Sequence, residues 1–340
     1  MNNRFIKACR REQVDCTPVW FMRQAGRYMP EFRAIRKKYP LLTVCKTPEL
    51  AAEVTLQPIK RFDFDAAIIF SDILLPLEAM GLSVEFVNGE GPVIHNPIRD
   101  KSGVEKLRPV VVEESLGFVA EAIRMVCPTL QVPLIGFSGA LFTLASYMIE
   151  GGATRNYIHT KQMMYDPSGA WALLMSKLTN VLAEYLLAQV TAGAAVIQVF
   201  DSWVGALSPE DYRLYVLPYM KVFFSRLRSY GVPLIHFGTG TATLLAMQKE
   251  AGGDVIGLDW RVNLDMGWQV LGGDVAVQGN LDPVALFAPK LELENRVNDI
   301  LQRAQNRPGH IFNLGHGILP DTPEASVEAV IELVHKRRTG

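Results

Sequence analysis

Short apolar runs recur along the chain, and each ends near a polar residue or a glycine. They are rich in β-branched and aromatic residues without regular polar alternation, which is typical of parallel strands covered on both faces. The runs span residues 18–22, 66–70, 132–137, 194–200, 233–237, 255–258, 275–278 and 310–314. Eight such runs are the number that a closed parallel barrel requires.

Helical patterns with clear starting signals lie between these runs. Residues 47–49, 208–210 and 322–324 each combine a capping hydroxyl, a proline for the first helical position and an acid. Glycines at 231, 252–253 and 272–273 stand where helices should end before the next strand. We therefore expect residues 1–340 to form one α/β domain, a (β/α)8 TIM barrel. An open doubly wound sheet is the alternative, because one sequence does not reveal the order of its strands.

Polar residues lie at or just beyond the ends of the apolar runs. In a barrel these ends gather at one rim, where such folds place binding and catalytic groups. For Ser138, Asp259 and Asn280, a purely local role in turns is an equal alternative. The residues expected at the rim are Arg23, Asp72, Ser138, Asp201, Ser202, His236, Asp259, Asn280 and His316.

Composition excludes several classes of protein. The 340 residues are 49% hydrophobic and 20% charged, which does not fit a disordered chain. Basic and acidic residues number 34 and 35, so a general affinity for nucleic acid or acidic membranes is not indicated. Residues 1–7 lack the apolar core of a signal peptide, and the apolar stretch 186–200 is too short to span a bilayer. We expect a cytoplasmic protein.

The cysteines and short motifs indicate neither a redox site nor a common cofactor. Cys9, Cys16, Cys45 and Cys127 form no CxxC pair and are expected to be reduced and mostly buried. No P-loop, HExxH or EF-hand motif occurs, and the six histidines provide no local pair of metal ligands. The glycine-rich segment 237–241 has amides suited to an anion, but a strand-to-helix turn is the favoured interpretation.

The first rim segment, PVWFMRQAGRYMPEFR at residues 18–33, carries two arginines four residues apart. A planar guanidinium holds a carboxylate through two hydrogen bonds, so Arg23 and Arg27 are candidates for binding one anionic ligand. The basic residues that follow, Arg36, Lys37 and Lys38, are expected to form a solvated surface.

This segment closely resembles the signature of the uroporphyrinogen decarboxylase family. Further similar segments are IFSDIL at 69–74, GFSGALFTLASYMIEGG at 136–152, FDSW at 200–203 and NLGHG at 313–317, in the family's order. The resemblance covers essentially the whole chain. It implies a cytoplasmic (β/α)8 enzyme of haem and porphyrin biosynthesis, usually a homodimer, that uses no cofactor or metal. Such an enzyme converts the four acetate side chains of uroporphyrinogen III to methyls, giving coproporphyrinogen III and carbon dioxide.

The resemblance also implies site residues. The substrate-binding positions are Arg23, Gln24, Ala25, Gly26, Arg27, Asp72, Tyr147, Ser202 and His316, and the catalytic ones among them are Arg27, Asp72, Tyr147 and His316. Asp72 matches the aspartate that binds the pyrroles; the alternative role for a residue after a buried strand is to cap the next helix. The proton donor stays open between Arg27, His316, Tyr147 and a bound water.

The proposed chemistry is possible without a cofactor. A pyrrole protonated at the ring carbon beside the acetate arm is a cation that accepts the electrons released with carbon dioxide. A carboxylate can accept hydrogen bonds from pyrrole N–H groups and stabilise that cation. We expect Asp72 to supply this effect, while Arg23, Arg27 and His316 organise the carboxylates of the substrate.

Two alternatives belong to other classes. A zinc-dependent methyltransferase on the same barrel would carry a His-x-Cys pair on the fifth strand and a later cysteine. Here the fifth strand reads His236-Phe237-Gly238, and no cysteine follows Cys127. A non-catalytic tetrapyrrole carrier is the other alternative, and the retention of Asp72 alongside Arg23 argues against it.

Overall fold

A curled parallel sheet organises the protein. The computed structural model describes residues 3–87 and 91–337, and within them the main sheet has seven strands in the order β1-β4-β5-β6-β7-β8-β9. Because this order follows the chain without reversal, the doubly wound alternative is wrong. The strands are β1 (Ala67–Ile68), β4 (Leu134–Gly139), β5 (Val196–Asp201), β6 (Leu234–Gly238), β7 (Val255–Gly257), β8 (Ala276–Gln278) and β9 (His310–Ile311). A separate antiparallel pair joins β2 (Val84–Val87) to β3 (Gly91–Ile94).

Side chains from distant strands meet inside the curl. Strands β5 and β8 are separated by β6 and β7 in the sheet, yet Gln278 Nε2 donates to Gln198 Oε1 at 3.1 Å. Trp20 Nε1 in turn donates to Gln278 Oε1 at 2.9 Å. A flat sheet would hold these strands too far apart for such contacts, since neighbouring strands are about 4.8 Å apart.

The first apolar run is not a strand, which corrects the expectation of eight. Val19 forms only an isolated parallel bridge to Phe312, on the β9 side. On the β1 side the Asp65 amide donates to the Val19 carbonyl at 2.9 Å, and the Val19 amide donates to Asp65 Oδ2 at 2.8 Å. Further along, the Met22 amide donates to the side chain of Asn313 at 3.2 Å. At Val19 and Met22 the backbone amides thus donate to side chains, where a regular ladder would have them donate to backbone carbonyls. The segment therefore lies between β9 and β1 without full strand geometry. The other seven runs coincide with strands.

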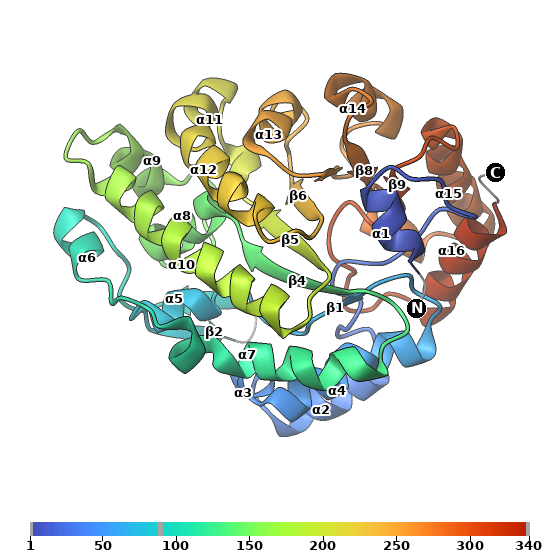
Figure 1. Cartoon of the computed structure of the whole chain (residues 1–340), viewed down its shortest axis with the longest axis horizontal. Coiled ribbons are helices and arrows are strands. Elements are labelled where there is room, and N and C mark those ends of the chain that lie inside the picture. Colours follow the sequence, from blue (N-terminus) through green and yellow to red (C-terminus); the bar gives the residue numbers. More distant parts are fainter. Residues whose placement is uncertain (1–2, 88–90, 338–340) are drawn as a thin grey trace.

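Helices surround the outer face of the curled sheet (Figure 1). The α-helices are α1 (Arg4–Cys9), α2 (Pro30–Lys38), α3 (Leu41–Lys46), α4 (Pro48–Arg61), α5 (Leu75–Ala79), α6 (Lys101–Glu105), α7 (Val112–Val126), α8 (Leu141–Glu150), α9 (Ile158–Tyr165), α10 (Ala170–Ala192), α11 (Pro209–Tyr215), α12 (Leu217–Arg228), α13 (Leu245–Ala251), α14 (Leu264–Leu271), α15 (Lys290–Ala304) and α16 (Glu324–Lys336). The short 3-10 helices are η1 (Cys127–Thr129), η2 (Val204–Ala206) and η3 (Pro283–Phe287). None of the helices in the described part of the chain is long and apolar enough to cross a membrane.

The expected helix starts are only partly correct. Ser208 caps α11, because its hydroxyl accepts the Asp211 amide at 3.1 Å. Thr47 precedes α4 without a side-chain capping bond. Helix α16 begins one residue later than expected, and the hydroxyl of Thr322 donates back to the Leu319 carbonyl at 2.9 Å. A hydroxyl before Pro-Glu therefore predicts the place of a helix better than its capping bond.

The remaining local expectations agree with the structure. Cys9, Cys45 and Cys127 are free thiols, and of the four cysteines Cys127 alone is partly exposed. The glycine-rich segment 237–241 connects β6 to α13, as the favoured interpretation required. Its Gly240 amide donates to Asp259 Oδ2 at 2.6 Å, so an internal carboxylate takes the place of an external anion.

Candidate active site

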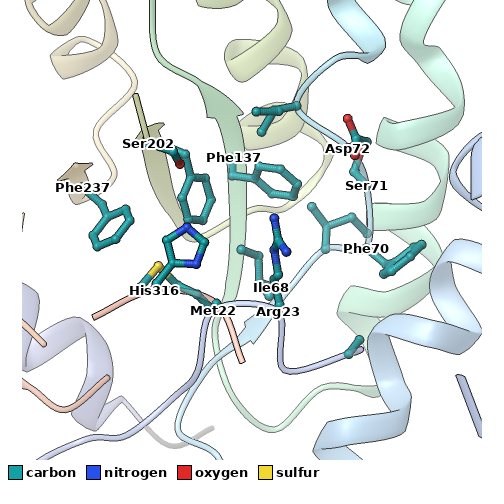
Figure 2. Close-up of a pocket in the computed structure, with 15 residues that line it drawn as sticks. Met22, Arg23, Ile68, Phe70, Ser71, Asp72, Phe137, Ser202, Phe237 and His316 are labelled. Atoms are coloured by element: carbon teal, nitrogen blue, oxygen red, sulfur yellow. The ribbon is translucent and has the colours of Figure 1, made fainter. Parts of the chain in front are cut away.

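A pocket opens where the strands of the main sheet end (Figure 2). Its volume is about 810 Å³, counted to the open mouth. The pocket is lined by residues from β1, β4, β5 and β6, from the segments after β1, after β5 and after β9, and by Met22, Arg23 and Ala25. The carboxyl ends of parallel strands thus converge here, as they do at the sites of barrel-type α/β enzymes.

Three phenylalanines on neighbouring strands form one wall of the pocket, which we call the strand wall. Phe137, Phe200 and Phe237 come from β4, β5 and β6. The rings of Phe137 and Phe200 meet edge to face at 5.5 Å, and those of Phe200 and Phe237 at 6.0 Å. Sequence reasoning missed this wall, although an aromatic residue near the end of three consecutive apolar runs was the available signal. The wall offers a flat apolar ligand an apolar surface.

Arg23 brings a positive charge to the side of the pocket opposite Ser202 and Asp72 (Figure 2). Its backbone has φ 62°, a left-handed conformation that is uncommon for a residue other than glycine. A Cβ at Gly317 would lie 2.5 Å from Arg23 Cδ, so the arginine side chain runs directly over this glycine. The left-handed backbone at Arg23 and the absence of a side chain at Gly317 therefore allow the Arg23 side chain to lie here.

His316 lies beside Arg23 in the pocket (Figure 2). Burial lowers the pKa of His316 to about 4, and the positive charges of Arg23 and Arg261 act in the same direction. The edge of its ring faces Trp260, with ring centres 6.5 Å apart. The imidazole is therefore neutral at pH 7 and is available to donate or accept a hydrogen bond.

Asp72 holds the turn before α5 with one carboxylate oxygen and also lines the pocket. Its Oδ1 accepts the Leu74 amide at 2.9 Å, a turn bond at the start of α5. Within residues 3–87 and 91–337, Oδ2 receives no hydrogen bond and Asp72 forms no ion pair. Burial raises the pKa of Asp72, although the Leu74 amide and the charge of Arg23 oppose the shift. One oxygen thus anchors the turn and the other is available to a ligand.

Two polar residues of the expected site remain, Ser202 and Tyr147, and Tyr147 is not among the residues that line the pocket, although it lies near enough to feel the charges of Asp72 and Arg23. Ser202 lines the pocket directly. Tyr147, on α8, is half-buried and stacks on Trp203 with 3.8 Å between ring centres. Burial raises the pKa of Tyr147, and the negative charge of Asp72 adds to the shift. The tyrosine therefore keeps its proton at neutral pH.

The segment 23–27 divides its residues between the pocket and the scaffold. Ala25 lines the pocket. The Gln24 side chain is fully buried; its Nε2 donates to the Ala66 carbonyl at 3.2 Å. A Cβ at Gly26 would lie 2.8 Å from the Arg23 carbonyl oxygen, so this position requires a residue without a side chain. Arg27 is exposed and is not among the residues that line the pocket. The structure thus brings Arg23, but not Arg27, into the pocket with Asp72.

Several residues expected at the rim lie elsewhere. The expectation for His236 is wrong: it lies within β6, fully buried, with its ring centre 4.8 Å from that of Phe224 on α12. Successive strand residues face opposite sides, so His236 faces the helices while Phe237 faces the pocket. Asn280 has the turn role given as its alternative, because its Nδ2 donates to the Asp259 carbonyl at 2.8 Å. Ser138 is buried inside β4.

A curled parallel sheet with a pocket at the carboxyl ends of its strands defines a barrel-type α/β protein, and the mixed apolar and charged lining suits an anionic ligand with a large apolar surface. Among solved structures, a methyltransferase from Methanosarcina mazei superposes with a TM-score of 0.82 over 98% of both chains. Its sequence identity is 21%, so this likeness shows the fold alone.

Sequence comparisons identify the family. The family model described as uroporphyrinogen decarboxylase (URO-D) matches residues 1–337. A uroporphyrinogen decarboxylase from Sorangium cellulosum is 57% identical over 98% of this chain and 96% of its own length. One from Carboxydothermus hydrogenoformans is 56% identical over 99% and 97%. The chain belongs to the uroporphyrinogen decarboxylase family, which confirms the resemblance found in the sequence and disfavours the methyltransferase alternative.

Proposed function

We propose that this protein decarboxylates the four acetate side chains of uroporphyrinogen III to methyls, giving coproporphyrinogen III in porphyrin and haem biosynthesis. The relatives at 56–57% identity carry the name of this carboxy-lyase activity. The observation that carries the proposal is the placement of Asp72 and Arg23 around one apolar wall. A tetrapyrrole with carboxylate arms presents a matching pattern: an apolar ring system, central N–H donors and peripheral anions.

Each turnover exchanges carbon dioxide for a proton. Protonation of a pyrrole carbon beside the acetate arm makes the ring an electron acceptor. The bond from the arm to its carboxylate then breaks, carbon dioxide leaves, and the electron pair enters the ring. A proton added to the remaining methylene gives the methyl group, and the ring loses its extra proton. The net change per arm is the uptake of one proton and the release of one carbon dioxide.

Asp72 has the central role in this proposal. Its Oδ2 can accept hydrogen bonds from pyrrole N–H groups, while Oδ1 remains on the Leu74 amide. The ionised carboxylate stabilises the cationic ring in the step that forms it. Because burial already raises the pKa of Asp72, a cationic ring is a favourable partner for this carboxylate.

The other polar residues bind and orient the substrate. We assign Arg23 to a substrate carboxylate and the neutral His316 to a hydrogen bond, since a pKa of about 4 leaves little imidazolium at pH 7. Tyr147 and Ser202 supply hydroxyl groups, and Ala25 and Gly26 bring backbone close to the ligand. Arg27, at the exposed end of the segment, meets the outer carboxylates. Gln24 acts through the backbone that its buried side chain holds in place.

We further propose the assembly and location that the family resemblance implies. Residues 1–340 would form one catalytic domain, in which the segment 18–22 completes a (β/α)8 barrel between β9 and β1. The bridge of Val19 to Phe312 and the bond from the Asp65 amide to Val19 support this closure. The protein would act in the cytoplasm as a homodimer without a cofactor, and light scattering on the purified protein tests the dimer.

The decisive experiment is an anaerobic assay with uroporphyrinogen III. Reaction mixtures are oxidised and separated by chromatography, and porphyrin fluorescence is followed from eight carboxylates toward four. We expect coproporphyrin from protein treated with a chelator, and none from heat-inactivated protein. Tight binding without any porphyrin of fewer carboxylates would support the carrier instead. Activity that requires stoichiometric zinc would contradict the cofactor-independent reaction.

A further inference from the structure

A single buried hydroxyl connects helix α8 to the segment that follows strand β5. Thr143 Oγ1 donates to Asp201 Oδ1 at 2.8 Å and accepts the Trp203 amide at 3.1 Å. Thr143 and Asp201 have no exposed surface. One threonine therefore binds both neighbours of Ser202 in sequence, and the hydroxyl can do so because it is both donor and acceptor.

The consequence for Ser202 is a restrained backbone. The residue lies between two anchors on the same oxygen, and its own carbonyl accepts the hydroxyl of Thr239. Phe200, two residues before Ser202, is held as well, because the Ala140 amide donates to the Phe200 carbonyl at 2.8 Å. Ser202 enters the pocket from this restrained segment (Figure 2). The restraint therefore fixes the point on the backbone from which the Ser202 side chain enters the pocket.

The same hydroxyl also bears on Tyr147, through Trp203. Tyr147 lies four residues after Thr143 on α8, so both are on one face of the helix. The Trp203 ring stacks on the Tyr147 ring at 3.8 Å with 29° between their planes, and the Tyr157 ring packs edge-on against Trp203 at 5.6 Å. Trp203 is thus fixed to α8 by its backbone at one turn and by its ring at the next.

We propose that Thr143 is a positioning residue, whose hydroxyl holds Ser202 and, through Trp203, Tyr147 in the geometry that the substrate requires. This inference rests on the proposed function, because it concerns how two of the proposed substrate contacts are placed. Thr143 touches neither the pocket nor the reacting atoms. Its effect is to fix two hydroxyl groups, which come from different elements, relative to each other.

Asp201 serves this arrangement as a hydrogen-bond acceptor. Its Oδ1 is occupied by Thr143, while its Oδ2 is buried without a hydrogen-bond partner among the described residues. Burial raises the pKa of Asp201 to about 7, so the carboxyl is often uncharged at neutral pH. An amide oxygen can replace the acceptor. Asp201→Asn should therefore keep kcat/KM within about threefold of wild type.

The test compares three threonine substitutions in the anaerobic decarboxylation assay. Thr143→Val keeps the shape and removes the hydroxyl, and we expect kcat/KM to fall about 10- to 100-fold through misplaced contacts. Thr143→Ser restores the hydroxyl and should stay within about threefold of wild type. Thr179→Val is the matched control, since the Thr179 hydroxyl is also buried in a helix and donates to the Met175 carbonyl at 2.8 Å. Near-wild-type turnover in Thr143→Val, or failure of serine to rescue, would overturn the proposal.

A double-mutant comparison separates positioning from general damage. In a Tyr147→Phe Ser202→Ala background the groups that Thr143 positions are gone, so Thr143→Val should change kcat/KM by less than about threefold. A full repeat of the original loss in that background would show that Thr143 acts by another route. If Thr143→Val does not fold, the pair Trp203→Phe and Trp203→Ala serves instead. The phenylalanine keeps a stacked ring and should retain most of the activity, which alanine should not.

A spectroscopic readout keeps this proposal distinct from the proposed function. Stacked Tyr147 and Trp203 rings contribute to near-ultraviolet circular dichroism, and Trp203→Phe identifies that contribution. Thr143→Val should reduce it, whereas Thr143→Ser and Thr179→Val should preserve it. An unchanged band in Thr143→Val would refute the positioning role even if the wild type is active. If the wild type does not turn over uroporphyrinogen III, the proposed function fails, while the band still tests whether Thr143 holds Trp203 on Tyr147.

Discussion

The two sides of the pocket are built in different ways. The strand wall consists of Phe137, Phe200 and Phe237, which stand on regular neighbouring strands; Phe200 and Phe237 are in direct register. The charged and polar residues Arg23, Asp72 and His316 line the same pocket from segments without strand geometry. The backbone ladder places the aromatic rings, so their positions follow from the same hydrogen bonds that hold the fold together.

The irregular segments that carry these residues depend on individual contacts instead. Arg23 has φ 62° and crosses Gly317 closely, and the preceding Met22 is held by the side chain of Asn313. Asp72 likewise sits in a turn fixed by one bond to the Leu74 amide. The comparison teaches that substitutions in the strand wall act through stability, whereas substitutions in the irregular segments change function while the fold remains.

Asp72→Asn should produce the largest functional effect. Asparagine keeps the turn bond to the Leu74 amide but removes the charge that the proposed mechanism uses. We expect kcat to fall by about 10²–10³-fold with a much smaller change in KM, as for the loss of a group that acts on the transition state. Steady-state kinetics in the anaerobic assay measures both constants.

Asp166→Asn is the matched control for this change. Asp166 is exposed and accepts the amide two residues ahead, Ser168, at 2.9 Å, as Asp72 does from Leu74. Turnover and melting temperature should match wild type in the control. Near-normal turnover in Asp72→Asn would remove Asp72 from the mechanism and would break the contrast between the two sides of the pocket.

Gly317→Ala should give the next largest effect. The new methyl group would lie 2.5 Å from Arg23 Cδ, and because Arg23 has a flexible side chain it moves aside while the backbone stays. Displacing one charged contact should raise KM about tenfold and leave kcat within about threefold. Substrate titrations together with a thermal melt separate this from unfolding.

Gly273→Ala provides the comparison for Gly317→Ala. A Cβ at Gly273 meets no atom within 4 Å, so that variant should behave as wild type. If Gly317→Ala binds substrate normally, the position of Arg23 is not critical and the irregular side is more tolerant than we infer.

The sequence predicted the regular part of this architecture well, for a physical reason. Strands buried on both faces are mostly apolar, and seven of the eight apolar runs in the sequence coincide with strands. The exception, 18–22, takes its bonds from Asp65 and Asn313, which are distant in sequence. The sequence around residues 18–22 does not indicate that distant side chains replace the backbone bonds of a strand there.

The candidate site was predictable only where it follows strand ends. Arg23, Asp72, Ser202 and His316 were expected there, and the structure gathers all four around one pocket. The direction of a residue inside a strand was not predictable, because a shift of one residue reverses it, which is why His236 was misplaced. Thr143 was missed because its partners come from another part of the chain.

The smallest expected effect is a dependence of stability on pH, and it arises from buried histidines in the strands. His310, in β9, is buried and has its pKa lowered by burial from 6.5 to about 4. The unfolded chain therefore binds more protons than the folded one between pH 6.5 and pH 4, so stability falls as the pH drops through this window. His236 and His316 shift in the same direction. Asp201 opposes them: its pKa is raised from 3.8 to about 7, so its contribution to stability falls as pH rises between these values.

Urea unfolding at pH 7 and pH 6 measures how the free energy of unfolding changes with pH. It also allows a buried histidine, His310, to be compared with an exposed one, His159. His310→Gln keeps a donor for the Gly279 carbonyl, 3.0 Å from the ring nitrogen, and removes the titrating group. The loss of stability from pH 7 to pH 6 should then shrink by about 0.5–1 kcal/mol relative to wild type. His159→Gln, at an exposed position, should leave the difference unchanged. Asp201→Asn should enlarge it by a similar amount, because the opposing group is gone. If wild type and His310→Gln lose the same stability between pH 7 and pH 6, β9 accommodates a charged imidazole at His310. The regular strands would then be less rigid than we infer from their hydrogen-bonded pairing.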